Sequence, residues 1–136
     1  MTVYKSKIGL SIVLLLVLVL GTTSYLMIKD GAWLGLLLNI LVALVIGYIF
    51  IQTRYTIKGD ILIVKCTFLI NKSYEIKRIT KITETNNPLS APAASLDRLE
   101  INFDNYDSVL ISPKQKSEFI SHLKILNPNI VVTLKK

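Results

Sequence analysis

The distribution of hydrophobic and polar positions divides the chain into two unlike parts. Residues 8–28 and 33–51 form two apolar runs without a charged side chain, separated by the short polar segment 29–32. A helix rises about 1.5 Å per residue and needs ~20 apolar residues to cross a hydrocarbon core of ~30 Å. Both runs reach that length, so residues 1–53 are predicted to form a transmembrane hairpin of two antiparallel helices.

Basic residues flank this hairpin at its two outer ends, whereas its connection holds one lysine, Lys29, beside Asp30. The positive-inside rule then predicts a multi-pass protein of the bacterial cytoplasmic membrane with both termini in the cytoplasm. A signal peptide with the apolar region 8–20 is the alternative, but the apolar run continues to residue 28. The flanking basic residues are Lys5, Lys7, Arg54 and Lys58.

Polar and aromatic residues in the hairpin suggest how its helices contact each other and where they meet the membrane surface. Asn39 is the one strongly polar side chain within a span, and it should lie at the depth of Thr22, so a hydrogen bond between the helices is expected. The hairpin is interpreted as an anchor, and a homo-oligomer formed through it is an open alternative. Five aromatic residues near the predicted span ends are expected in the headgroup zone: Tyr4, Tyr25, Trp33, Tyr48 and Tyr55.

Residues 54–136 have the pattern of short β-strands. β-Branched runs on both sides of Gly59-Asp60 predict a hairpin, and Asn71-Lys72 predicts a second turn. Ile76, Ile79 and Ile82 are assigned to a strand with a bend near Arg78. Further predictions are a loop at 86–95, strands at 98–103 and 108–111 around a turn at 104–107, and a short strand at 130–134. Together they describe a meander of six or seven strands.

One amphipathic helix is predicted after this meander. Ser112 is interpreted as its N-cap, Pro113 as its first helical residue, and Gln115 as the partner that completes a capping box. Asn127-Pro128 should end the helix. Its apolar stripe, which needs the sheet as a packing surface, consists of Phe119, Ile120, Leu123 and Leu126.

The reactive side chains argue against catalysis and against a metal or cofactor site. The chain has one cysteine, Cys66, and one histidine, His122, so it lacks an internal disulfide and a structural zinc ligand set. Cys66 is expected to pack as a small apolar side chain. No Ser, Cys and acid arrangement accompanies His122, and Gly59 is the sole glycine after residue 53. We therefore expect no enzyme.

The charge favours a membrane surface over nucleic acid as a partner. The chain carries a net charge of +7, and the thirteen bases and eight acids after residue 53 give that part +5. An anionic leaflet attracts each nearby basic residue by roughly 1 kcal/mol. Four residues are candidates for a lipid-facing basic patch, although strand alternation also fits a solvated surface: Lys72, Lys77, Arg78 and Lys81.

Several motifs in a fixed order resemble the bacterial PH domain family typified by YyaB, over about residues 54–130. They are Tyr55-x-Ile57-x-x-Asp60-x-Leu62, Ile76-x-x-Ile79-x-x-Ile82, the loop that ends in Ser95-Leu96-Asp97-Arg98, and Ile111-Ser112-Pro113 followed by Phe119 and Asn127-Pro128. The resemblance implies an α+β chain: a PH-like antiparallel β-barrel or sandwich at 54–136, capped by one C-terminal helix. It also implies frequent attachment to membrane spans and no enzymatic activity.

The leading functional hypothesis is a membrane-anchored binding module that recognises a protein or peptide partner at the inner leaflet. Ser95, Asp97 and Arg98 are candidate partner- or ligand-facing residues, with a structural role at the loop end as the alternative. Two other functions stay open. One is an anionic lipid headgroup sensor. The other is a bacteriocin-type immunity protein, because a lantibiotic-type immunity protein carries a related domain.

Overall fold

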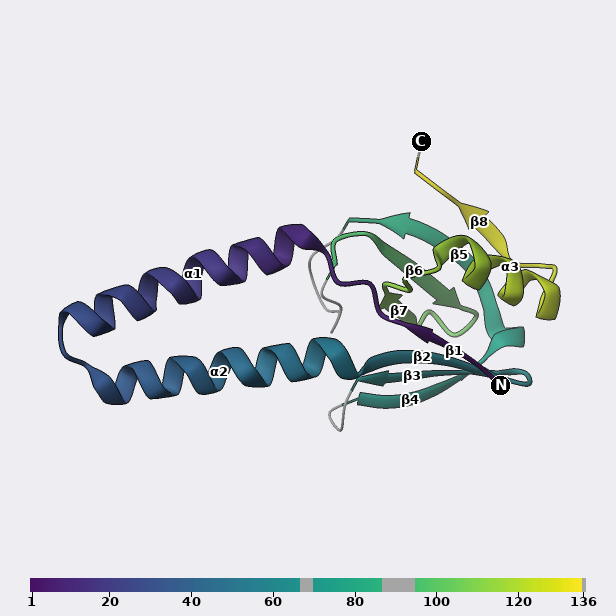
Figure 1. Ribbon diagram of the computed structural model, residues 1–136. Coiled ribbons are helices and arrows are strands. Elements are labelled where there is room, and N and C mark those ends of the chain that lie inside the picture. The colour runs from purple at the N-terminus through teal and green to yellow at the C-terminus, as the bar shows by residue number, and fades with distance from the viewer. Residues whose placement is uncertain (67–69, 87–94, 136) are drawn as a thin grey trace.

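The computed structural model describes residues 1–66, 70–86 and 95–135 and shows a helical hairpin projecting from one end of a β domain (Figure 1). The hairpin consists of α1 (Leu10–Lys29) and α2 (Trp33–Gln52), each of 20 residues. Gly31 has a φ of +69° in the tight turn between them. Both helices are apolar and long enough to cross a membrane, and neither has a residue buried in the protein.

Asn39 links the two helices, as predicted. Its Nδ2 group donates to the hydroxyl oxygens of Ser24 at 2.8 Å and Thr23 at 3.0 Å, and to the carbonyl of Leu20 at 3.1 Å. Thr22, the residue expected at the same depth, instead donates to the carbonyl of Leu18 in its own helix. The hydroxyl partners of Asn39 therefore lie one to two residues further along α1 than the symmetric hairpin implied, and its carbonyl partner lies two residues earlier.

The first sheet has the order β1-β2-β3-β4 and is antiparallel throughout. The predicted Gly59-Asp60 hairpin is confirmed, with Gly59 at a φ of +58°. The turn predicted at Asn71-Lys72 is wrong, because both residues lie within β4 and pair with Lys65 and Val64 of β3. The strands are β1 (Thr2–Lys5), β2 (Thr53–Lys58), β3 (Ile61–Cys66) and β4 (Ile70–Glu75).

The strand β1 is the main addition to the sequence-based prediction. Residues 2–5 precede the hairpin, yet they pair with β2 in the domain that follows it, with Tyr4 opposite Tyr55. Both tyrosines are therefore buried in the core, and their predicted place in the headgroup zone is wrong. Tyr25, Trp33 and Tyr48 lie on the hairpin with exposed side chains, as that prediction requires.

The second sheet has the order β7-β6-β5-β8, in which β8 runs parallel to β5 and the other pairs are antiparallel. The bend predicted near Arg78 is a single 3-10 turn, η1 (Ile76–Arg78), followed by a bulge between Ile79 and Lys81. Most of the loop predicted at 86–95 lies outside the described residues. The strands are β5 (Ile79–Thr85), β6 (Arg98–Phe103), β7 (Ser108–Ile111) and β8 (Val131–Thr133).

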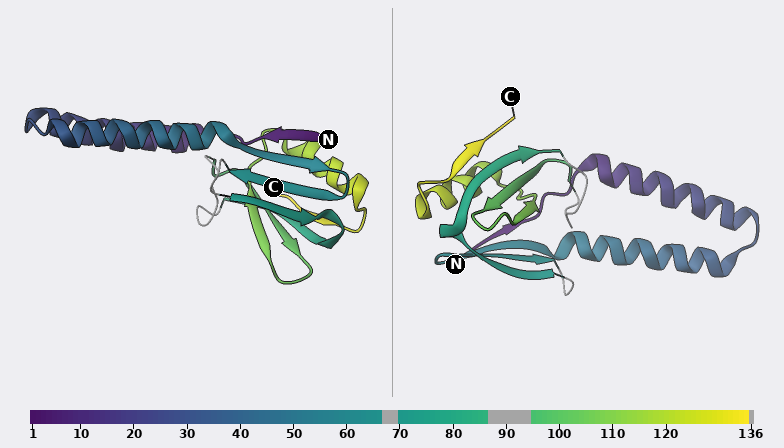
Figure 2. Two further views of the ribbon diagram at one scale, coloured as in Figure 1. Left: turned by 90° about the horizontal axis from the view of Figure 1, so that it is seen from below. Right: turned by 180° about the vertical axis from the view of Figure 1, so that it is seen from behind.

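One helix, α3 (Lys116–Leu126), packs its predicted apolar stripe into the core between the sheets. Phe119 and Leu123 are fully buried, and the ring of Phe119 meets Tyr4 edge-on at 5.1 Å. The two views in Figure 2 show the hairpin leaving one end of this two-sheet domain. The predicted α+β sandwich with a single C-terminal helix is confirmed, with eight described strands where six or seven were expected.

The predicted start of this helix is wrong. α3 begins at Lys116, its N-cap is Gln115 without a side-chain capping bond, and the Gln115 amide instead donates to Glu118. The polar groups of Ser112 are already used elsewhere, and Pro113 forms an isolated antiparallel bridge with Ser6. Residues 112–113 therefore continue alongside Ser6 and are followed by a bend at residues 114–115, which delays the first helical turn.

Candidate functional site

The three candidate residues at the end of the 86–95 segment form a compact polar turn. Ser95 and Arg98 are both buried. The Arg98 Nε group donates to the carbonyl of Ser95 at 2.7 Å, and the Ser95 hydroxyl accepts from the backbone N–H of Asp97 at 3.1 Å. Burial lowers the pKa of the Arg98 guanidinium. These contacts give Ser95 and Arg98 a structural role, while a ligand- or partner-facing role stays a prediction.

Asp97 stands at the centre of a network of charges between the hairpin and the domain. One of its carboxylate oxygens accepts from the Lys7 ammonium at 2.7 Å, and the other accepts from Lys116. Lys116 also donates to Glu84 of β5, whose second oxygen accepts from the Lys135 backbone N–H at 2.9 Å. The network thus joins the residues before α1 to β5, α3 and the start of β6.

The ionisation of this network follows from its contacts. Burial alone would raise the pKa of the Asp97 carboxyl, but hydrogen bonds from Lys116 and Lys7 outweigh it and hold that pKa below its ordinary value. The Lys116 hydrogen bond also lowers the pKa of Glu84. Burial opposes the charge on Lys116, yet its two carboxylate partners raise its pKa. All three groups are therefore charged at neutral pH.

Backbone contacts fasten the same junction. The N–H of Lys7 donates to the carbonyl of Ser112 at 2.7 Å, and the N–H of Lys114 donates to the carbonyl of Lys5 at 2.9 Å. The Ser112 N–H donates to the Tyr55 hydroxyl at 3.1 Å, and its own hydroxyl donates to the carbonyl of Asp97. Residues of the Ile-Ser-Pro motif are therefore hydrogen-bonded to the segment that leads into α1.

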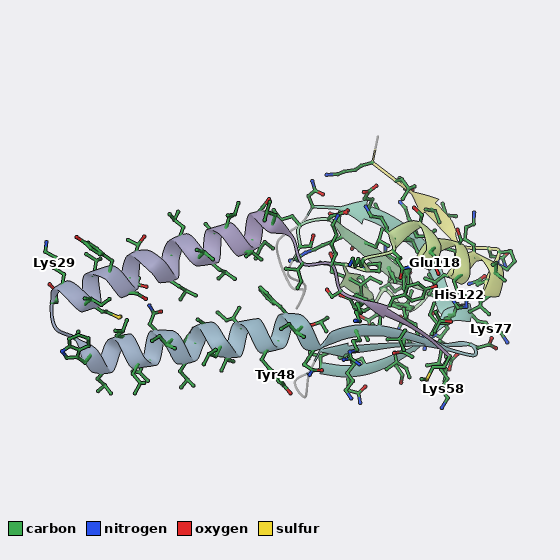
Figure 3. All side chains as sticks on the ribbon, in the orientation of Figure 1. Lys29, Tyr48, Lys58, Lys77, Glu118 and His122 are labelled. Atoms are coloured by element: carbon green, nitrogen blue, oxygen red, sulfur yellow. The ribbon has the colours of Figure 1, made fainter. Side chains whose placement is uncertain are left out.

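The structure distributes the four predicted lipid-facing residues over three separate elements. Lys72 lies on β4 of the first sheet, and Lys81 lies on β5 of the second. Lys77 and Arg78 belong to η1, where they pair with Asp60 and Asp104, each at 3.0 Å. Figure 3 shows Lys77 at the end of the domain away from the hairpin. A single basic patch facing a membrane beside the hairpin does not follow from these positions.

Basic residues instead gather where the helices enter the domain. Lys5, Arg54 and Lys65 lie directly opposite one another on β1, β2 and β3, and all three are exposed. Lys114 lies beside them, because its backbone N–H donates to the carbonyl of Lys5. Sequence reasoning used Lys5 and Arg54 only to orient the hairpin. The sequence did not reveal this cluster because it did not reveal the strand pairing of residues 2–5. That pairing brings the basic residues from both ends of the hairpin together.

The outer edge of β4 is a second candidate surface. The two-residue turn makes Lys58 and Ile61 a hydrogen-bonded pair, and such pairs alternate along antiparallel strands. The bonds between β3 and β4 therefore fall at even-numbered residues of β4. The odd-numbered residues, Asn71, Ser73 and Glu75, direct their backbone N–H and C=O groups outward. Among the described strands, only β3 pairs with β4, so this edge is open to another chain.

The described side chains offer little for catalysis or metal binding. His122 is half-buried and shares a hydrogen bond of 3.1 Å between its Nδ1 atom and the Tyr4 hydroxyl. Within residues 1–66, 70–86 and 95–135, no group of three His, Cys, Asp or Glu side chains could hold a metal ion. The predicted packing of Cys66 lies outside the described side chains.

Two sheets packed face to face, with a single C-terminal helix against their core, define a PH-like domain. Domains of this class are generally binding modules without catalytic activity. The family profile of the bacterial PH domain matches residues 53–127, more than half of the chain, and the protein belongs to this family. The resemblance inferred from its motifs is confirmed. A comparison with curated proteins gives no match.

Proposed function

We propose that the protein is a membrane-anchored, non-catalytic binding module whose PH-like domain recognises a protein or peptide partner at the cytoplasmic face of the inner membrane. The observation that carries the proposal is the open edge of β4. A partner segment in extended conformation can pair with the outward backbone groups of Asn71, Ser73 and Glu75 and so add a strand to the first sheet.

The edge is suited to reversible strand addition. Asn71, Lys72 and Ser73 are exposed, whereas Tyr74 is half-buried and stacks on Phe103 of β6 with ring centroids 4.7 Å apart. That stack holds β4 against the second sheet, so the edge is fixed before a partner arrives and loses little conformational entropy on binding. Lys72 discourages pairing between copies of the same edge through repulsion of like charges.

The membrane part of the proposal rests on the two apolar helices and on the distribution of charge at their ends. Basic residues gather at the domain end of the hairpin, whereas its tip carries Lys29 beside Asp30. By the positive-inside rule, this distribution supports a cytoplasmic location for the domain and both chain ends. The anchor keeps the domain at the membrane without headgroup recognition by Lys77 or Arg78, which the ion pairs of η1 already engage.

Site-specific photocrosslinking in the full-length chain tests the proposal. A photoreactive amino acid replaces Asn71 in cells that make the protein in its own membrane, and it is expected to give a discrete adduct with one protein or peptide. Adding Ser73→Pro removes an outward N–H without a ladder bond to β3, so the adduct should disappear. Ser73→Ala keeps that N–H and should leave the adduct unchanged.

Two further comparisons make the result decisive. The same photoreactive group at Tyr106, a fully exposed turn residue on the second sheet, should give no adduct of that mass. Thermal unfolding of the Ser73→Pro and Ser73→Ala proteins must agree, so that a lost adduct reports the edge and not the fold. An adduct that survives Ser73→Pro would exclude strand addition at β4. An adduct with a membrane-active peptide would favour the immunity alternative.

A further inference from the structure

A basic groove lies between the two helix ends at the border of the domain. Its volume is about 610 Å³, and its lining combines basic residues from three segments with apolar residues from both helix ends. No described residue of the lining is acidic. The basic lining residues are Lys5, Lys7, Arg54 and Lys114, and the apolar ones are Ile8, Phe50 and Ile51.

Most of the positive charge in this groove is uncompensated. Lys7 is neutralised by Asp97, its ion-pair partner. Lys5, Arg54 and Lys114 are exposed, and none of them forms an ion pair with another described residue. Three cations held on neighbouring backbone segments, with Lys114 bonded to the backbone of Lys5, favour an anionic group with several acceptor oxygens.

An apolar groove continues from the basic one between the helices. It has a volume of about 330 Å³, and the two grooves share Ile8, Phe50 and Ile51. Gly47 lines its floor, and a Cβ atom added there would meet no atom within 4 Å, so the space is open. The lining thus changes from purely apolar along the helices to basic in the segments just outside them.

This order matches a phospholipid in the cytoplasmic leaflet, with its acyl chain along the helices and its phosphate at their cytoplasmic ends. We propose that the composite groove binds one anionic phospholipid, whose phosphate contacts Lys5, Arg54 and Lys114 and one of whose acyl chains lies along Gly47. Basic pockets between transmembrane helices on the cytoplasmic side commonly hold such headgroups. The proposal rests on the membrane anchoring in the proposed function, but it uses a different surface from the β4 edge.

Native mass spectrometry of the full-length protein tests this site. The protein is released from bilayers that contain equal amounts of phosphatidylglycerol and phosphatidylcholine with identical acyl chains, and the lipid that stays bound is counted. One phosphatidylglycerol per chain is expected. The double variant Arg54→Gln/Lys114→Gln should bind it roughly 30-fold more weakly, because each basic residue near an anionic headgroup contributes about a factor of five.

Matched variants separate the site from general charge and bulk. Lys58→Gln/Lys77→Gln removes the same charge at the far end of the domain, where Figure 3 places both residues, and it should retain the lipid. Gly47→Leu fills the apolar groove and should weaken retention even though all cations remain. Leu44→Phe adds bulk to the exposed surface of α2, outside the groove, and should leave lipid retention unchanged. Soluble glycerol phosphate should fail to compete, because it has no acyl chain.

Each outcome decides the proposal. Equal retention of the two lipids, or full retention by Arg54→Gln/Lys114→Gln, would overturn it. Loss of retention in Lys58→Gln/Lys77→Gln as well would show adsorption governed by net charge and would also overturn it. Resistance of the wild-type chain to carbonate extraction from membranes tests the anchor separately. A protein that resists extraction but shows no lipid preference would leave the proposed function standing without this site.

Discussion

Lys7 and Asp97 lie 90 residues apart in the chain and form an ion pair of 2.7 Å between the ammonium and a carboxylate oxygen. Lys7 stands just before α1, and Asp97 just before β6. The pair therefore ties the first helix to the second sheet, while the second helix is tied to the first sheet because α2 runs directly into β2. Both ends of the hairpin are fixed to the domain, so the hairpin and the PH-like domain should move as one unit.

Asp97→Asn should weaken this connection measurably. The substitution removes the carboxylate charge that Lys7 and Lys116 share, and Lys116 keeps only Glu84 as a charged partner. A loss of about 1–2 kcal/mol in the free energy of unfolding is expected, because hydrogen bonds to charged groups contribute more to stability than hydrogen bonds between neutral groups. Denaturant unfolding in micelles would measure it. Asp104→Asn breaks the exposed pair with Arg78 and should cost less than about 0.5 kcal/mol. Equal losses would contradict the assigned role of Asp97.

The same network predicts how stability depends on pH. Asp97 and Glu84 have folded-state pKa values below their ordinary values of 3.8 and 4.5, so their contribution is present above that range and is lost as pH falls through the lowered pKa. The pKa of Lys116 is raised above 10.5, so its contribution is present below 10.5 and is lost above it. The unfolding midpoint of the wild type should exceed that of Asp97→Asn most at neutral pH. A difference that persists at pH 2 would argue against the ion pairs.

Asn39 provides a test of the hairpin itself. Asn39→Leu removes the donors to Thr23 and Ser24 and leaves packing between α1 and α2 as the main contact. Interhelical hydrogen bonds in membranes contribute roughly 0.6 kcal/mol on average, so a modest loss of that size is expected in a detergent unfolding titration. Thr22→Val removes a hydroxyl that bonds only within α1 and should change little. If Thr22→Val costs as much as Asn39→Leu, the interhelical contact is not what stabilises the hairpin.

Local patterns predicted most of the elements correctly, since both apolar runs, the Gly59-Asp60 turn and the stripe of α3 depend on residues close in sequence. The errors at Tyr4 and Tyr55 have a cause that lies outside the local pattern. A four-residue strand such as β1 has no periodicity of its own, and it forms because β2 offers an edge and Phe119 packs against Tyr4. Tyr4 and Tyr55 were assigned to the headgroup zone because the partner strand was unknown.

The candidate sites were less predictable than the fold for the same physical reason. Lys5, Arg54 and Lys114 come from three separate segments, and only the pairing of β1 with β2 and with residues 112–114 brings them to one groove. Strand alternation alone could not show that Lys72 and Lys81 belong to different sheets. Sites assembled from distant segments need the tertiary contacts, whereas Asp97 stood out through a local motif.

Asn127 illustrates a local signal with a larger role than the sequence indicated. It ends α3 as predicted, but its buried amide also donates to the carbonyls of Ile76 at 3.0 Å and Ile79 at 3.1 Å on both sides of η1. Asn127→Ala would remove this donor from both carbonyls, leaving the Ile76 carbonyl only the Ile79 N–H, and should cost about 1–3 kcal/mol. Thermal unfolding of the full chain measures this. Asn129→Ala, at an exposed neighbouring position, should cost far less, and a similar loss would refute the bridging role of Asn127.

Ser112 allows the two interpretations of the Ile-Ser-Pro motif to be separated by experiment. At a helix N-cap, aspartate replaces serine at little cost, because both side chains accept hydrogen bonds from backbone N–H groups. In the structure, Ser112 is fully buried and its hydroxyl donates to the carbonyl of Asp97. Ser112→Asp would direct a buried carboxylate at a carbonyl oxygen, a repulsive arrangement that should cost at least about 3 kcal/mol.

Ser112→Ala completes the comparison, because it removes the donor without adding charge and should cost about 1–2 kcal/mol. The expected order of stability is therefore serine, then alanine, then aspartate, whereas an N-cap would place aspartate close to serine and alanine last. Denaturant unfolding of the three full-length proteins in the same micelles decides between the orders. Because the Ser112 carbonyl also binds the Lys7 N–H, aspartate should additionally loosen the segment before α1, and hydrogen exchange at residues 5–7 should accelerate.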